Sequence, residues 1–324
     1  MELHLHLEGA IPYETLWELI RKYGGDPSVP NMEALRKRFR YQDFPQFIET
    51  WIWKNQFLRE YEDFTFFAEG VARDLADQNI RYVEAFFSPP DLFRLGLDTP
   101  GLAQAIRAGL ARVPEIEINL IADVVRDWGP ELAERTLSEA LEAREYGVIG
   151  LGMGGSDYKF PPEPFEKVYA RARRYGLHVT AHAGEASGPE SIWGAIRALQ
   201  VERIGHGLHA KDDKDLLDYL AKTQIPLEIC PLSNVCTGVV KTIEEHPVHS
   251  FFEHGLFITI NTDDPKMFGN SLAEEYQVLE DRLGFSRQEI KTLILQGISA
   301  SWLSPERKQD LSEEFCGHPA WQEA

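Results

Sequence analysis

The chain is poor in cysteine and has no long apolar run. Its three cysteines, Cys230, Cys236 and Cys316, form no CxxC pair and are odd in number. A disulfide framework is therefore not expected, and a reducing compartment fits. No apolar run approaches the roughly 18 residues of a membrane span. Residues 1–10 carry charge and histidine where a secretory signal would be apolar. We expect a cytoplasmic protein.

Positive charge is also scarce. The sequence has 33 basic and 52 acidic residues, a formal net charge of −19. Such a surface repels nucleic acid and anionic membrane, so neither is an expected partner. At 324 residues and 43% apolar content the chain is globular, and its length suits an α/β barrel, which takes about 250 residues or more.

Short β-rich segments alternate with helical patterns along the chain. Residues 131–147 and 162–176 are two such helical patterns, and each ends at a glycine. We expect eight strands, at 2–7, 81–87, 117–125, 148–154, 177–183, 203–207, 226–232 and 257–262. This alternation predicts a parallel sheet, and eight strands favour an α/β fold of the (β/α)8 TIM-barrel type. No GxGxxG opens the first helix, which argues against a dinucleotide-binding fold. We expect a single barrel domain over 1–324.

The connection after the first strand is long and carries extra helices. Its segment 44–58, "FPQFIETWIWKNQFL", includes Trp51, Trp53 and Phe57. These aromatic residues fit either core packing or a flap over the barrel mouth, where long loops build active sites. The sequence leaves both interpretations open.

Ionisable side chains occur at the ends of apolar strands. His4 and His6, in "HLHLEG", are two residues apart, so they point to one face of the first strand. One more strand ends in "HAGE" (182–185) and another in "GHG" (205–207), and the last ends in "NTDDP" (261–265). The carboxyl ends of barrel strands meet at the face that does chemistry. A single such residue could be an ion pair, but four such strand ends indicate one shared site.

These residues form a typical metal-ligand set. The imidazoles of His4, His6 and His182 with the carboxylate of Asp263 suit one Zn²⁺ ion. Glu185 and His206 are then available as acid–base groups, and Asp264 as a partner of the substrate. The pattern predicts metal-assisted hydrolysis at a polarised C–N centre.

The motifs "HLHLEG", "HAGE", "GHG", "CPLSN" and "NTDDP", in this order over essentially the whole chain, resemble the adenosine deaminase family of the amidohydrolase superfamily. The resemblance implies one zinc, held by His4, His6, His182 and Asp263. It implies that Asp263 helps to take a proton from the attacking water and that His206 stabilises the resulting hydroxide. Glu185 would protonate the ring nitrogen beside the attacked carbon.

The resemblance also implies which residues contact the purine, namely His6, Glu8, Gly155 and Asp264. Asp264 would meet the imidazole-ring nitrogen, and the Gly155 amide, in "GLGMGGSD", would meet the pyrimidine-ring nitrogen. A strand-to-helix turn is the alternative role of Gly154 and Gly155. The expected reaction converts a 6-aminopurine nucleoside, similar to adenosine, into the 6-oxopurine and ammonia.

The chain departs from adenosine-specific members of that family at Glu8, where they usually carry aspartate facing the ribose. "HLHLEG" also resembles relatives that deaminate adenine or aminodeoxyfutalosine, whereas "NTDDPKMFGNSLAEEY" is closer to nucleoside deaminases. Adenine deaminase and aminodeoxyfutalosine deaminase are thus the alternatives. A barrel that binds nucleosides without catalysis is a further one, but the full set of Glu185, His206 and both aspartates argues against it.

Two other classes of hydrolase fit less well. Binuclear amidohydrolases carry a lysine at the end of the fourth strand, and "GLGMGGSD" has none; small zinc deaminases need HxE with PCxxC, which is absent. Ordinary structural roles are expected elsewhere: a salt bridge for Glu84, a loop-shaping role for Ser233 and Asn234, and an apolar role for Cys230. Solvated or helix-capping roles are expected for His209, His246, His249 and His254.

Overall fold

The computed structural model describes residues 1–41 and 44–323, and its centre is one sheet of eight parallel strands. The strands pair in chain order, each with the next. Their bounds are β1 Glu2–His6, β2 Tyr82–Phe87, β3 Glu117–Val125, β4 Val148–Gly154, β5 His178–Ala183, β6 Arg203–His206, β7 Leu227–Ile229 and β8 Ile258–Ile260. All eight strands lie within the segments predicted from the sequence.

The sheet closes where the chain segment after β8 meets β1. An isolated parallel bridge joins Leu5 to Asp263. The amide of His6 donates to the carbonyl of Asp263 at 2.9 Å, and the amide of Asp263 donates to the carbonyl of His4 at 3.1 Å. These hydrogen bonds complete the cylinder, so the predicted (β/α)8 barrel is confirmed.

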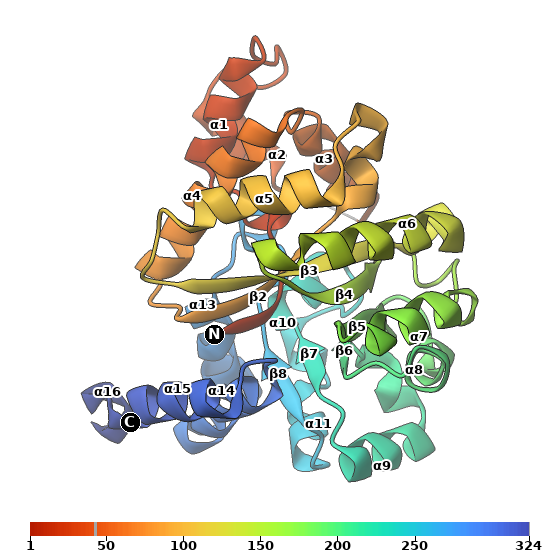
Figure 1. The fold of residues 1–324 in the computed structure, drawn as a ribbon. Coiled ribbons are helices and arrows are strands. Elements are labelled where there is room, and N and C mark those ends of the chain that lie inside the picture. The colour runs from red at the N-terminus through yellow and green to blue at the C-terminus, as the bar shows by residue number, and fades with distance from the viewer. Residues whose placement is uncertain (42–43, 324) are drawn as a thin grey trace.

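Helices surround the strands on the outside of the barrel (Figure 1). The predicted helical segment 162–176 contains α7, whereas α6 begins at Gly129, two residues before the predicted segment 131–147. The chain turns at Gly147 and Gly176 with positive φ. The helices are α1 Tyr13–Lys22, α2 Met32–Arg38, α3 Phe44–Asn55, α4 Tyr61–Asp77, α5 Thr99–Leu110, α6 Gly129–Glu142, α7 Glu166–Arg174, α8 Pro189–Gly194, α9 Lys214–Thr223, α10 Pro231–Cys236, α11 Val248–Glu253, α12 Pro265–Phe268, α13 Leu272–Leu283, α14 Arg287–Ala300, α15 Pro305–Gly317 and α16 Pro319–Glu323. None of these helices in the described part of the chain is long and apolar enough to span a membrane.

Four helices, α1 to α4, fill the long connection between β1 and β2, as the sequence predicted. In Figure 1 they gather at one side of the barrel, with α3 among them. The ring of Trp51 in α3 lies edge-on to the ring of His6, with 6.4 Å between centroids. Trp53 packs on Phe57 instead, which is buried. Core packing is therefore confirmed for Phe57, whereas a flap over the barrel mouth stays a prediction that the position of Trp51 beside His6 is compatible with.

The strands are buried on both faces, which explains their near-continuous apolar sequence. Inside the barrel, the interior face also holds a buried ion-pair network. Arg203 of β6 contacts Glu84 of β2 at 2.5 Å and Glu228 of β7 at 2.6 Å. The predicted salt bridge of Glu84 is therefore confirmed, and so is the buried position of Cys230.

Candidate active site

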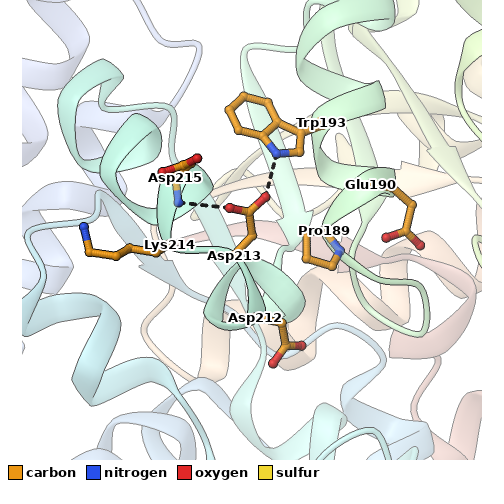
Figure 2. Close-up of a pocket in the computed structure, with 7 residues that line it drawn as sticks. All are labelled: Pro189, Glu190, Trp193, Asp212, Asp213, Lys214 and Asp215. Carbon is orange, nitrogen blue, oxygen red and sulfur yellow. Dashed lines mark hydrogen bonds between the residues drawn. The ribbon is translucent and has the colours of Figure 1, made fainter.

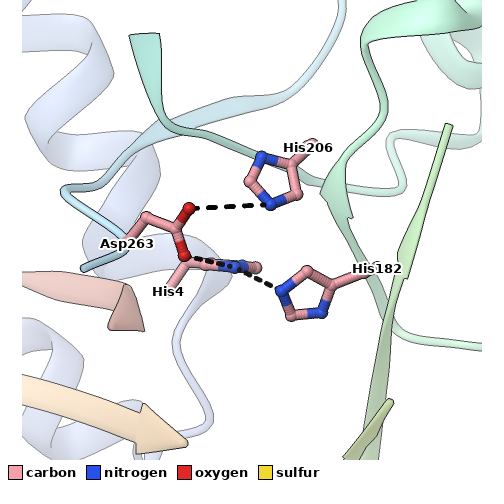
Figure 3. Close-up of side chains that lie close together, drawn as sticks. All are labelled: His4, His182, His206 and Asp263. Atoms are coloured by element: carbon pink, nitrogen blue, oxygen red, sulfur yellow. Dashed lines mark hydrogen bonds and ion pairs between the residues drawn. The ribbon is translucent and has the colours of Figure 1, made fainter. Parts of the chain in front are cut away.

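Three imidazoles from two strands meet at one point inside the barrel. His4 and His6 project from β1, and His182 projects from β5 on the far side. The Nε2 atom of His182 lies 3.0 Å from Nε2 of His4 and 3.2 Å from Nε2 of His6. Figure 3 shows His4 and His182 approaching each other beside Asp263. The structure thus brings together the histidines predicted from β1 and β5.

The outer nitrogens of two of these rings face oxygen acceptors. Nδ1 of His4 lies 2.7 Å from Oε2 of Glu228, and Nδ1 of His182 lies 2.9 Å from the carbonyl of Met153. Each Nδ1 must therefore carry the ring proton, which leaves Nε2 of the neutral ring unprotonated. Burial lowers the pKa of both histidines well below the usual value, and neighbouring cationic groups add to this, so both rings are neutral.

Two unprotonated nitrogens that face each other at 3.0 Å repel unless a cation lies between them. The carboxylate of Asp263 completes the surroundings, since its Oδ1 lies 3.4 Å from Nε2 of His6 and 3.6 Å from Nε2 of His4. Ligand atoms of His4, His182, His206 and Asp263 all lie within 4.8 Å of one another. This donor set fits a divalent metal, and neutral imidazole with carboxylate is a typical zinc set.

His206 and Asp263 leave their strands from unusual backbone conformations. Their φ angles are +59° and +67°, in the left-handed region that residues other than glycine seldom adopt. Such strain persists where surrounding contacts hold it, often at functional sites. Here Ser233 donates to Oδ2 of Asp263 at 2.6 Å, and Asn234 contacts Nδ1 of His206 at 3.1 Å.

The carboxyl group of Glu185 lies next to His206. Its Oε2 is 3.7 Å from Nε2 of His206, which is itself 4.0 Å from Oδ2 of Asp263. The pKa of Glu185 is raised to about 8, mainly by burial and in smaller part by the nearby Asp157, while Arg126 opposes the shift. The predicted acid is therefore protonated at neutral pH, as a proton donor must be.

Asp264 has a carboxyl oxygen with no protein partner. Its side chain is buried, and Oδ1 has no hydrogen-bond partner among the described residues. The group lies directly against Gly9, because a Cβ atom at that position would be 1.7 Å from Oδ1. Only glycine permits this approach. An unpartnered buried acceptor is costly, so a ligand that donates a hydrogen bond fits here.

Glu8 lies in a similar environment. Its Oε1 accepts from the amide of Ser88 at 3.0 Å, whereas its buried Oε2 has no partner in the described chain. A buried lysine of α3, Lys54, acts electrostatically on both Glu8 and Asp264. The ammonium of Lys54 lies 3.9 Å from the ring centroid of Trp51 and donates to Asn55 at 2.7 Å.

Gly155 follows β4 with a φ of +91° and is exposed. A Cβ atom at this position would lie 2.2 Å from Oδ2 of Asp127, which accepts from the amide of Ser156 at 2.8 Å. Gly155 therefore makes a tight turn after its strand, the alternative role expected from the sequence. Its predicted contact with the purine stays a prediction.

The sequence did not single out several residues that the structure places around the site. Glu228 and Asp123 are carboxylates within apolar strands, a signal that could have found them. Asp123 is buried with Oδ1 unpartnered among the described residues. Ser233 and Asn234 do more than shape a loop, since they contact Asp263 and His206.

His246 also departs from expectation. The predicted solvated role is wrong, because only 4% of its surface is exposed. Its predicted capping role is confirmed, since Nδ1 accepts from the amide of Val248 at the start of α11. The other three histidines, His209, His249 and His254, are partly exposed and lie near Asp212, Glu253 and Asp218.

A separate hollow of about 540 Å³ lies between α8 and the start of α9 (Figure 2). Asp213 lines this hollow, and its carboxylate accepts from the indole of Trp193 at 2.9 Å and from the backbone amide of Asp215 at 2.9 Å. The hydrogen bond from the amide of Asp215 caps α9, and the one from Trp193 links α9 to α8. None of the site residues predicted from the sequence lines this hollow.

Comparison with known proteins gives a consistent result. The family model described as "Adenosine deaminase" matches residues 1–317. An adenine deaminase of Bordetella avium is 38% identical over 92% of this chain and 95% of its own length. An aminodeoxyfutalosine deaminase of Streptomyces coelicolor is 35% identical over 98% of this chain and 84% of its own length. An adenosine deaminase of Edwardsiella ictaluri is 36% identical over 98% of this chain and 98% of its own length.

Solved structures show the same similarity. The adenine deaminase of Arthrobacter aurescens superposes with a TM-score of 0.93 at 31% identity, covering 100% of this chain and 98% of that one. An amidohydrolase of Burkholderia ambifaria, solved with bound zinc, gives a TM-score of 0.84 at 26% identity, covering 100% and 90%.

Proposed function

Because this chain belongs to the adenosine deaminase family, we propose that it is a zinc-dependent hydrolase that converts a 6-aminopurine into the 6-oxopurine and ammonia. The proposal is carried by one observation: the carboxyl groups of Glu185 and Asp263 lie 3.7 and 4.0 Å from Nε2 of His206, beside three converging imidazoles. An acid, a base and a polar stabiliser are thus available at one reacting carbon.

His4, His6, His182 and Asp263 would hold the zinc ion. Zinc in such a site lowers the pKa of water to about 7 and supplies a nucleophile at neutral pH. Glu228 supports this set, because it holds the proton of His4 on Nδ1 and directs the unprotonated Nε2 into the site. The carboxylate of Asp263, fixed by Ser233, would accept the proton released by the attacking water.

Glu185 would donate its proton to the ring nitrogen next to C6, which makes C6 electrophilic. Water then adds to C6, so that a C–O bond forms and the C6–N6 bond breaks. The departing amino group takes up a proton and leaves as ammonia. His206 would stabilise the oxygen that becomes the 6-oxo group, a role that a fixed donor fills well in a buried site.

Asp264 and Glu8 would hold the rest of the substrate through their unpartnered oxygens. Lys54 is the cation that acts on both carboxyls, while Asp91 adds a further negative charge at Lys54. An excess of carboxyl groups over ammonium groups disfavours a phosphate here. We therefore propose a substrate without a phosphate group, with adenosine as the first candidate.

Adenine is the second candidate. It is favoured by the names of the Bordetella and Arthrobacter proteins and by the glutamate at position 8. A free base also keeps an N–H on its imidazole ring, which suits two unpartnered carboxyl oxygens. Aminodeoxyfutalosine, the substrate named for the Streptomyces relative, is the third.

A substrate panel tests this assignment. Zinc-loaded protein is incubated with adenosine, 2′-deoxyadenosine, adenine, aminodeoxyfutalosine and AMP, and ammonia release is followed with the ultraviolet loss of the 6-aminopurine. We expect turnover of adenosine or adenine with kcat/KM at least about 100-fold above that of AMP, equal to about 2.7 kcal/mol. Absence of ammonia from every substrate would overturn the proposal, and preference for AMP would overturn the assignment of a substrate without phosphate.

A further inference from the structure

We propose that Asn234 and His246 are positioning residues that fix His206 as a neutral imidazole with its proton on Nε2. The three side chains form a chain of hydrogen bonds that begins at a backbone amide in α11 and ends at the active site. Its effect on rate depends on the proposed function, whereas the position of the proton does not.

The first link sets the direction of all the others. The amide of Val248 donates to Nδ1 of His246 at 3.1 Å. A backbone amide can only donate, so Nδ1 of His246 carries no proton. Burial lowers the pKa of His246 to about 3, with smaller contributions from Lys211 and His206, so the ring is neutral. Its single proton must therefore lie on Nε2.

The second link orients the side-chain amide of Asn234. Nε2 of His246 lies 3.2 Å from Oδ1 of Asn234, and a protonated nitrogen requires an oxygen there. The NH2 group of Asn234 must then face the other way, where it lies 3.1 Å from Nδ1 of His206. Because this NH2 group donates, Nδ1 of His206 accepts, and the proton of His206 lies on Nε2.

The packing around Asn234 keeps this arrangement in place. The backbone amide of Asn234 donates to the backbone carbonyl of Cys230 at 3.0 Å. The backbone carbonyl of Asn234 accepts from the amide of Val240 at 2.9 Å. Asn234, His206 and His246 have at most 4% of their surface exposed. Water cannot readily replace a link, and reversing the side-chain amide of Asn234 would place donor against donor at His246 and acceptor against acceptor at His206.

The consequence separates His206 from the other imidazoles. His4 and His182 present unprotonated Nε2 atoms that can bind a metal, whereas His206 presents an N–H. Although His206 lies within 4.8 Å of the other possible ligands, its Nε2 acts as a hydrogen-bond donor instead. This donor lies 3.7 Å from the carboxyl group of Glu185 and 4.0 Å from that of Asp263, where it can stabilise the reacting oxygen.

The experiment measures the proton position directly. Long-range ¹H–¹⁵N spectra of the zinc-loaded protein, with ¹⁵N-labelled histidine and without substrate, report the tautomer of each ring. A His206→Gln variant identifies the His206 signals. We expect the Nε2–H form for both His206 and His246 in the unsubstituted protein. A proton on Nδ1 of His206, or on both nitrogens, would overturn the proposal.

Two substitutions give the kinetic counterpart. Asn234→Asp replaces the donor with an acceptor of the same size, so His206 should move its proton to Nδ1 and kcat should fall about 100-fold. His246→Ala frees the amide to rotate and should lower kcat about 10-fold. KM and zinc content should change less than twofold in both variants.

His254→Gln is the matched control, because His254 ends the same helix α11 and pairs with Asp218 outside the barrel. It should match the unsubstituted protein in kcat and in the His206 spectrum. If Asn234→Asp keeps both the Nε2–H form and a normal kcat, the proposal is wrong. Absence of activity in the unsubstituted protein contradicts the proposed function but leaves the spectra interpretable.

Discussion

Oε2 of Glu185 lies 3.7 Å from Nε2 of His206, and both groups come from neighbouring strands of the barrel. Burial shifts the pKa values of the two side chains in opposite directions, which leaves both groups uncharged at neutral pH. Burial raises the pKa of Glu185 to about 8 and lowers that of His206, so a protonated carboxyl group faces a neutral imidazole. Proton donation to the substrate ring and stabilisation of the reacting oxygen are therefore available from two different residues.

Replacing Glu185 by glutamine removes the acidic proton without changing the size of the side chain. We expect kcat to fall by about 10²- to 10⁴-fold, the usual contribution of a general acid. Zinc content, measured by metal analysis, should stay the same, because Glu185 is not in the proposed ligand set. Glu190→Gln, on an exposed residue in the first turn of α8, is the control and should be fully active. A near-normal rate for Glu185→Gln would rule out the acid role.

The raised pKa of Glu185 predicts an alkaline limit to activity. Its protonated form is the active one, so kcat/KM should decline as the pH rises through about 8. The same shift means that the folded protein binds more protons than the unfolded chain between about 4.5 and 8. The contribution of Glu185 to stability is thus greatest below 4.5 and is lost as the pH rises through 8. A rate profile with no decline up to pH 10 would contradict this assignment.

Gly9→Ala tests the placement of Asp264. The added methyl group would lie 1.7 Å from Oδ1, so the carboxyl group must move. Displacement of a substrate-binding group by about 1 Å can cost about 100-fold in kcat/KM, and we expect a loss of this order, mainly through KM. Gly317→Ala in α15 is the control, because no atom lies within 4 Å of its added Cβ. Equal kinetic constants for the two variants would show that Asp264 does not bind the substrate.

Glu228→Gln tests how His4 is prepared for metal binding. The carboxylate holds the proton of His4 on Nδ1, and loss of such a partner typically weakens zinc binding about 10- to 100-fold. Chelator competition measures the affinity, and the melting temperature of the zinc-free protein shows whether the fold survives. Glu202→Gln is the matched control, since Glu202 pairs with the partly exposed His178 away from the site. Unchanged zinc affinity in Glu228→Gln would show that Glu228 serves only the ion pair with Arg203.

The sequence was sufficient to predict the barrel because its strands are buried on both faces and read as apolar runs between amphipathic helices. The convergence of His4, His6, His182 and Asp263 followed from strand order alone. The contact between Glu228 and His4 could not be predicted from the sequence. A carboxylate in a short strand has the same sequence pattern whether it pairs with Arg203 or with His4. His246 was harder still, because its link to His206 depends on how α10 and α11 pack, which no local pattern encodes.

The closure of the barrel between β1 and the segment after β8 has a consequence for how the protein folds. The hydrogen bonds between His4, His6 and Asp263 join residues more than 250 positions apart, so they form only after nearly the whole chain has been synthesised. In a nascent polypeptide that stops before β8, the strand β1 can pair with β2 on one side, but the segment that carries Asp263 is missing on the other. Acquisition of the proposed zinc ion would then be a late event, and its uptake during refolding would report the moment when the cylinder closes.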